Sequence, residues 1–160
     1  MMKRFRICVA LCLIAVLFSS FAYGAMRMRA REFAVLCSNA SPQDVRAALN
    51  AGSKPTEQVL ITAAYSNPYP EVIRILISEA QRYGLDLSKR RTIGANILNS
   101  AVRGGKPEIV RAVMSFGVNV NARDNSGRTP MEEALRYGYK SEEPGRQEII
   151  NILRNAGAKR

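Results

Sequence analysis

Histidine and tryptophan are absent from this chain of 160 residues, which contains only three cysteines. Histidine is the side chain that enzymes use most often as a general base, and it is a common zinc ligand, so its absence removes the simplest catalytic and metal sites. Cys8 and Cys12 lie in an early apolar run, and Cys37 stands alone in the rest of the chain. We therefore predict no enzyme, no metal and no cofactor, and we interpret Cys37 as a small packed residue.

Acidic residues are also scarce. The chain has 13 Asp and Glu residues and 24 Lys and Arg residues, which gives a net charge of +11. A chain this basic attracts any polyanion. Nucleic acid is nevertheless disfavoured as a partner, since no basic helix, helix-turn-helix or aromatic RNA-binding stripe is visible. Two interpretations of the charge stay open: a solvated, solubilising surface, and contact with an acidic protein or an anionic envelope surface.

The first 24 residues have the composition of a secretory signal peptide. Three basic residues within positions 1–6 precede an unbroken apolar run at 7–18, and small residues follow up to Gly24. The run is shorter than the ~20 residues that span a membrane, so we prefer cleavage after Gly24 to an uncleaved anchor. Cleavage would lower the net charge from +11 to +8. We expect an exported protein, in the periplasm in preference to the medium.

A turn that starts a helix is the clearest motif, at residues 124–135. Gly127 supplies the positive φ of a tight turn, and Thr129 is the expected N-cap, followed by a proline at the first helical position. Glu132 lies three residues after Thr129 and completes a capping box. We expect this helix to end at Gly138.

The same pattern occurs one period of 33 residues earlier, which is a repeat length typical of stacked helix pairs. The positions that match are Gly94 with Gly127, Leu98 with Met131, Ala101 with Ala134, and Gly105 with Gly138. We therefore predict that Gly94 and Gly127 lie in equivalent turns and that Ala101 and Ala134 are buried.

The run Thr129-Pro130-Met131-Glu132-Glu133-Ala134 resembles the ankyrin signature T-P-L-H-x-A, with Glu in place of His. This resemblance implies an all-α ankyrin-repeat solenoid of about four helix-turn-helix repeats with short β-turn fingers. The repeats would cover about 30–52, 53–90, 91–123 and 124–160, within a domain at 25–160.

Two irregularities in the spacing carry expectations of their own. Four additional residues before Gly84 predict that the second helix of the second repeat is about one turn longer and continues through Gln81. The last repeat is interrupted at 139–147 by a polar stretch with a proline and a glycine, which we expect to be a surface loop.

The resemblance also implies how such a protein acts, since ankyrin-like stacks recognise other proteins with their fingers and with the ends of their first helices, along a concave face. The positions in this chain are Tyr65, Ser66, Lys89, Arg90, Arg103, Asn125, Arg128, Arg136 and Tyr137. We expect a module of the bacterial envelope that docks an acidic partner protein on this basic face. We expect no small-molecule substrate, and membrane contact only through the signal segment before cleavage. The alternative is a structural, inhibitory or protective (immunity-like) partner of an envelope enzyme, acting through the 139–147 loop.

Overall fold

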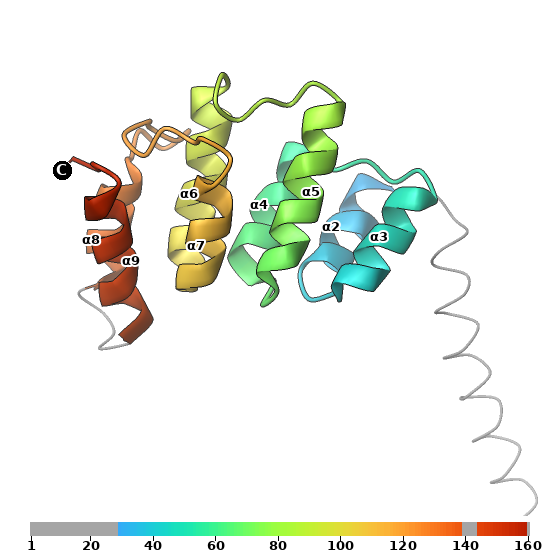
Figure 1. The fold of residues 1–160 in the computed structure, drawn as a ribbon, viewed down its shortest axis with the longest axis horizontal. Coiled ribbons are helices and arrows are strands. Elements are labelled where there is room, and N and C mark those ends of the chain that lie inside the picture. The colour runs from blue at the N-terminus through green and yellow to red at the C-terminus, as the bar shows by residue number, and fades with distance from the viewer. Residues whose placement is uncertain (1–28, 139–143, 160) are drawn as a thin grey trace, which may run out of the picture.

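A computed structural model describes residues 29–138 and 144–159, which form α-helices joined by turns and short connections (Figure 1). The expected signal peptide at 1–24 lies outside the described residues. Among the residues described, none of the helices is both long and apolar enough to cross a membrane. The helices are α2 (Ala30–Cys37), α3 (Pro42–Asn50), α4 (Glu57–Ser66), α5 (Pro70–Arg82), α6 (Arg91–Gly104), α7 (Pro107–Met114), α8 (Pro130–Gly138) and α9 (Pro144–Asn155).

The helices stack in antiparallel pairs that build two layers (Figure 1). One layer holds the first helix of each pair, with α4 packed between α2 and α6, and with α8 against α6. The other holds the second helices, with α5 between α3 and α7, and with α9 against α7. The all-α prediction of repeated helix pairs is confirmed.

Proline and hydroxyl side chains begin most of these helices. All four helices of the second layer start at a proline, where the missing N–H has no helical partner to lose. Ser41 accepts a hydrogen bond from the backbone N–H of Asp44 (3.3 Å) at the start of α3, and Thr56 does the same for Val59 (3.5 Å) at the start of α4. These proline, serine and threonine residues therefore determine where the helices begin.

The core lies between the two layers. The fully buried side chains include Phe33, Leu60, Leu98, Ile109 and Leu153, each at most 1% exposed. Ala101 (0% exposed) and Ala134 (4%) are buried as predicted. Cys37 is buried as well, and burial raises the pKa of its thiol to about 12, so the group stays protonated and packs as a small apolar residue.

The prediction that Gly94 lies in a turn equivalent to that of Gly127 is wrong. Gly127 has φ +74°, whereas Gly94 lies within α6, which begins at Arg91. A Cβ at position 94 would stand 3.1 Å from both the carbonyl oxygen of Leu87 and Cγ1 of Val118. This glycine therefore serves close packing, and helical turns of α6 occupy the place of the expected finger.

The longer helix in the second repeat is confirmed. The helix α5 has 13 residues, against 9 in α3 and 8 in α7. Ile77 and Ala80 still face the core, while Gln81 and Arg82 at its end are exposed. The additional turn extends past the edge of the stack without changing which side of α5 is buried.

The expected loop at 139–147 is wrong over its second part. The helix α9 begins at Pro144, so residues 144–147 are helical, and only 139–143 lie between α8 and α9, outside the described residues. The proline that suggested a loop stands at the first position of the helix. Close packing explains the glycine at position 145, because a Cβ there would stand 3.0 Å from the carbonyl oxygen of Gly105.

Replacing Gly104 by Ala should destabilise the stack by about 1–3 kcal/mol, although Ala is the better helix former by about 1 kcal/mol. Gly104 ends α6, and a Cβ there would overlap the backbone carbonyl of Tyr65 in α4. Urea unfolding measures the effect, with Ser78→Ala on the exposed side of α5 as a control that should stay within about 0.5 kcal/mol of the parent. A stabilised Gly104→Ala chain would contradict this packing.

Candidate functional site

The first group of predicted site residues lies at the ends of adjacent first helices. Tyr65, Arg103 and Arg136 occupy the last turns of α4, α6 and α8, which pack side by side. Tyr65 is 53% exposed and Arg136 is exposed, while Arg103 and Ser66 are half-buried. Tyr137 belongs to α8, but its side chain lies outside the described part of the chain.

The second group lies in the connections at the opposite end of the same helices. Lys89 and Arg90 precede α6, and Asn125 and Arg128 precede α8 (Figure 1). Lys89, Arg90 and Asn125 are exposed, and Arg128 is half-buried. The structure therefore divides the predicted residues between two edges of the stack.

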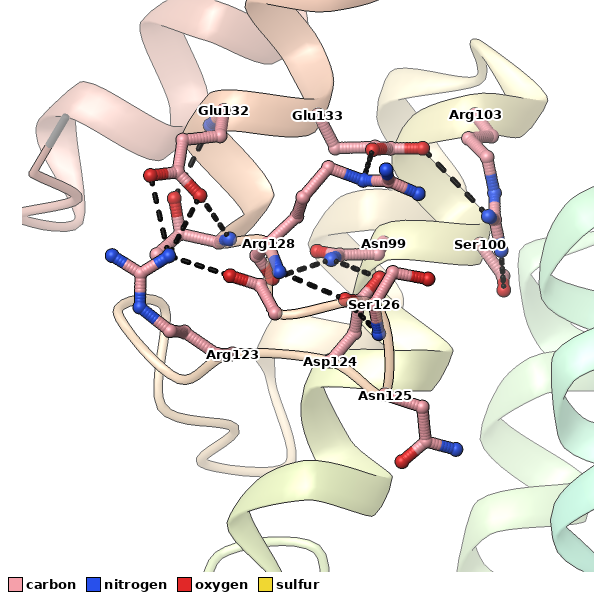
Figure 2. A network of polar contacts seen from close by, with 12 residues as sticks. Asn99, Ser100, Arg103, Arg123, Asp124, Asn125, Ser126, Arg128, Glu132 and Glu133 are labelled. Atoms are coloured by element: carbon pink, nitrogen blue, oxygen red, sulfur yellow. Dashed lines mark hydrogen bonds and ion pairs between the residues drawn. The ribbon is translucent and has the colours of Figure 1, made fainter.

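A buried carboxylate, Glu133, joins the two groups (Figure 2). It is 0% exposed, and its Oε2 lies 2.7 Å from Nε of Arg128, while its Oε1 lies 3.7 Å from Nη1 of Arg103. A buried charge without partners would be costly, so these two guanidinium groups are held by the fold as well as presented to solvent. Arg136 makes no ion pair among the described residues.

Arg103 is oriented from its own helix too. Its Nη2 donates to Oγ of Ser100 (2.9 Å), which in turn donates to the backbone carbonyl of Asn96 one turn earlier (2.8 Å). The guanidinium thus lies along α6 toward α8, with about a third of the side chain exposed (31%). Its charge at the surface is therefore only partly available to a partner.

The finger between α7 and α8 is fixed through Asp124. Its Oδ1 accepts from the backbone N–H groups of Ser126 (2.8 Å) and Arg128 (3.0 Å), which closes the turn. Its Oδ2 accepts from Nδ2 of the buried Asn99 in α6 (2.9 Å), which also donates to the carbonyl of Arg128 (3.0 Å). The finger and the preceding repeat are consequently one hydrogen-bonded unit.

A second amide of α6 extends this network over three repeats. Oδ1 of Asn96 accepts from the backbone N–H of Asn125 (2.9 Å), and its Nδ2 donates to Oε1 of Glu57 at the start of α4 (2.7 Å). The backbone of the predicted contact residue Asn125 is therefore held, while its side chain remains exposed. Such a finger presents its side chains without a large ordering cost on binding.

The surroundings of Asp124 lower its pKa. Burial alone would raise it, but the hydrogen bonds from Asn99, Arg128 and Ser126, together with the positive charge of Arg128, hold the pKa below its ordinary value of 3.8. The carboxylate is therefore ionised at neutral pH and accepts all three hydrogen bonds.

The predicted capping box at the start of α8 is confirmed. Thr129 N–H donates to Oε2 of Glu132 (2.8 Å), and Glu132 N–H donates to Oγ1 of Thr129 (3.2 Å). Arg123 adds an ion pair with Glu132 (3.1 Å). The hydrogen bond from Thr129 and the charge of Arg123 lower the pKa of Glu132. Glu132, which stands where the ankyrin signature has His, thus forms part of the N-terminal cap of α8.

The residues that sequence reasoning missed are Asn96, Asn99 and Glu133. Each is a polar side chain on a helix face that is otherwise apolar, and the spacing of Asn96, Asn99 and Ser100 places them on one side of α6. That spacing was the available signal. It indicates contact with a neighbouring repeat, although the sequence does not identify the contact.

The described residues give little support to a metal site or a small-molecule pocket. They contain no cluster of three or more Cys, Asp or Glu that could hold a metal ion. A hollow of about 560 Å³ lies between α3 and α5, lined by Leu49 and Ile75 and by charged residues such as Arg74. It belongs to the second-helix layer and includes none of the predicted site residues.

Comparison with known proteins agrees with the repeat pattern. A family profile described as "Ankyrin repeats (3 copies)" matches residues 60–159. An ankyrin repeat protein of Acanthamoeba polyphaga mimivirus is 30% identical over 73 residues, which are 46% of this chain and 10% of that protein. The aligned segment thus spans about a tenth of the relative's length.

Replacing Asp124 by Asn should cost about 1–2 kcal/mol at neutral pH, because the new amide nitrogen would face Nδ2 of Asn99. The pKa of Asp124 is lower in the folded chain than in the unfolded one, so its carboxylate stabilises the fold above the unfolded value. That contribution is lost as the pH falls below 3.8 and passes through the pKa that Asp124 has in the folded chain. The stability difference between the two chains should therefore shrink in acid, as urea unfolding across a pH series measures. A difference that stays constant across this range would contradict the assignment.

Proposed function

The chain belongs to the ankyrin-repeat family, and on that premise we propose that it is a protein-binding module that docks a partner protein on the concave face of its stack. Proteins built from these repeats generally bind other proteins. The contact residues that we propose are Tyr65, Arg103 and Arg136 at the first-helix ends, with Arg90 and Asn125 in the connections before α6 and α8.

The observation that carries this proposal is the exposed row at the ends of α4, α6 and α8. Tyr65 and Arg136 are exposed in equivalent last turns, with the half-buried Arg103 between them. Tyr and Arg are enriched among the residues that dominate binding energy at interfaces. The row also rests on helices rather than on loose loops, which limits the entropy that binding would cost.

The charge of this row favours an acidic partner. Arg103 of this row and Arg128 of the connection before α8 share one buried carboxylate, Glu133, so these three groups together leave one positive charge, and Arg136 adds a second. The attraction would act mainly on the rate of encounter and on the choice of partner, as complementary rim charges do.

We further propose that the partner lies in the bacterial envelope. The support is the basic, apolar and small-residue order of positions 1–24, which is typical of a secretory signal. The periplasm is the proposed compartment, with release to the medium as the alternative.

A double variant, Tyr65→Ala with Arg136→Glu, should reduce capture of the partner by at least about tenfold, since it removes both exposed anchors of the row. The mature chain serves as bait in an envelope extract of the source cells, at low and at moderate salt. Arg103 is left intact because its substitution would remove one of the two cations that face the buried Glu133.

The matched control is Tyr69→Ala with Arg154→Glu, which changes the same residue types at exposed positions of the α4–α5 connection and of α9. It should retain the partner. If the Tyr65 and Arg136 variant kept the same proteins at the same salt, this face would not be the binding site.

A further inference from the structure

The connections between repeats carry a row of cations along one edge of the stack. We call it the finger row: Lys54, Arg90, Arg91, Arg123 and Lys159, all exposed. Four of them come from successive connections, before α4, before α6, before α8 and after α9 (Figure 1), and Arg91 is the first residue of α6. The backbone N–H of Lys159 donates to Oδ1 of Asn121 (2.7 Å), which places the last member beside the α7–α8 finger.

Acidic side chains lie at both edges of the stack, and three of them stand at the other edge, where the second helices begin. Asp44, Glu71 and Glu108 lie in the first turns of α3, α5 and α7. Glu71 is paired with Arg46 (2.9 Å) and Glu108 with Arg111 (3.4 Å). The acids of the finger edge, such as Glu57 and Asp124, are likewise engaged, through hydrogen bonds from Asn96 (2.7 Å) and Asn99 (2.9 Å).

Most of the finger row has no acidic partner. Arg90, Arg91 and Lys159 make no ion pair among the described residues, and Nζ of Lys54 stands 5.0 Å from the centre of the Tyr83 ring. Arg123 is the exception, through its pair with Glu132. The nearby Asp86 is paired with Lys89 (3.3 Å), so it does not offset the arginines.

We infer that the finger row takes an extended acidic segment of a protein, an inference that rests on the proposed function and names the chemistry of its partner. Neighbouring helices pack about 8–10 Å apart, so the cations of successive connections share roughly that spacing. An extended chain advances about 3.3 Å per residue, so about three residues span one repeat. The row therefore matches a segment of about ten residues that has a carboxylate at roughly every third position.

The apolar content of this edge favours a peptide over a lipid surface. Binding to a bilayer combines positive charge with apolar side chains that enter the interface. Among the described residues of this edge, the large exposed hydrophobic residue is Tyr83, and its ring lies beneath Lys54. The Debye length at physiological salt, about 8 Å, is close to the repeat spacing, so each carboxylate would act mainly on its nearest cation.

The test uses the mature chain and two labelled synthetic peptides of equal composition. One has Glu at every third position among Ser and Gly, and the other has the same Glu residues in one run. Fluorescence anisotropy at low and at physiological salt should show several-fold tighter binding of the spaced peptide. Equal affinity for the two peptides would overturn the inference.

Arg90→Glu with Arg91→Glu should weaken binding of the spaced peptide by about tenfold. An acid at the start of α6 suits the helix dipole, so folding should be preserved. The control Arg74→Glu with Arg154→Glu makes the same change in net charge at exposed positions of α5 and α9 and should change affinity less than about twofold. Equal losses in both variants would show attraction by net charge alone and would overturn the inference.

Vesicles containing phosphatidylglycerol form the last arm of the test. Binding to them that exceeds binding to the peptide, and that is lost with Arg90 and Arg91, would identify a membrane surface and reject the peptide. If no peptide bound while the Tyr65 and Arg136 variant still lost its captured partner, the inference would fail and the proposed function would stand.

Discussion

Side-chain donors that reach back from one repeat to the terminal carbonyls of the repeat before it are the interactions on which the stack depends. Nδ2 of Asn67, which is 0% exposed, donates to the carbonyl oxygens of Cys37 (3.0 Å), the last residue of α2, and of Ala40 (3.1 Å), just beyond it. The last carbonyls of a helix have no partner within the helix and must find one elsewhere. One repeat later, Nζ of Lys106 meets the same need, donating to the carbonyl oxygens of Ser66 (2.5 Å) and Asn67 (3.3 Å).

The finger edge has its own version of this constraint, which fixes the register of the stack. Asn96 and Asn99 bond from α6 to the finger of the following repeat. Apolar contacts have no direction and would allow repeats to slide, whereas a buried amide must meet its partner at one offset. The exposed residues proposed for binding are therefore presented at set intervals, because the polar groups behind them allow one alignment.

The cap at the start of α8 and the burial of Ala101 and Ala134 could be predicted from the sequence, whereas the specific polar contacts between neighbouring repeats could not. Thr129 and Glu132 are three residues apart, so their reciprocal cap follows from the sequence alone. The repeat period aligns Gly94 with Gly127 and so predicts a turn at Gly94. The structure shows that a glycine is needed at position 94 because the backbone approaches Val118 closely. The half-burial of Arg103 likewise depends on Glu133, 30 residues away. The site residues themselves remain a prediction.

Hydrogen exchange of an Asn67→Ala chain tests the central claim most directly. Loss of the amide leaves the carbonyls of Cys37 and Ala40 unsatisfied, at a cost of about 1–3 kcal/mol. The account predicts that the backbone amides of α2 and α3 exchange about 10–100-fold faster, while those of α6 and α8 keep the protection of the parent chain. Unchanged exchange in α2 and α3 would contradict it.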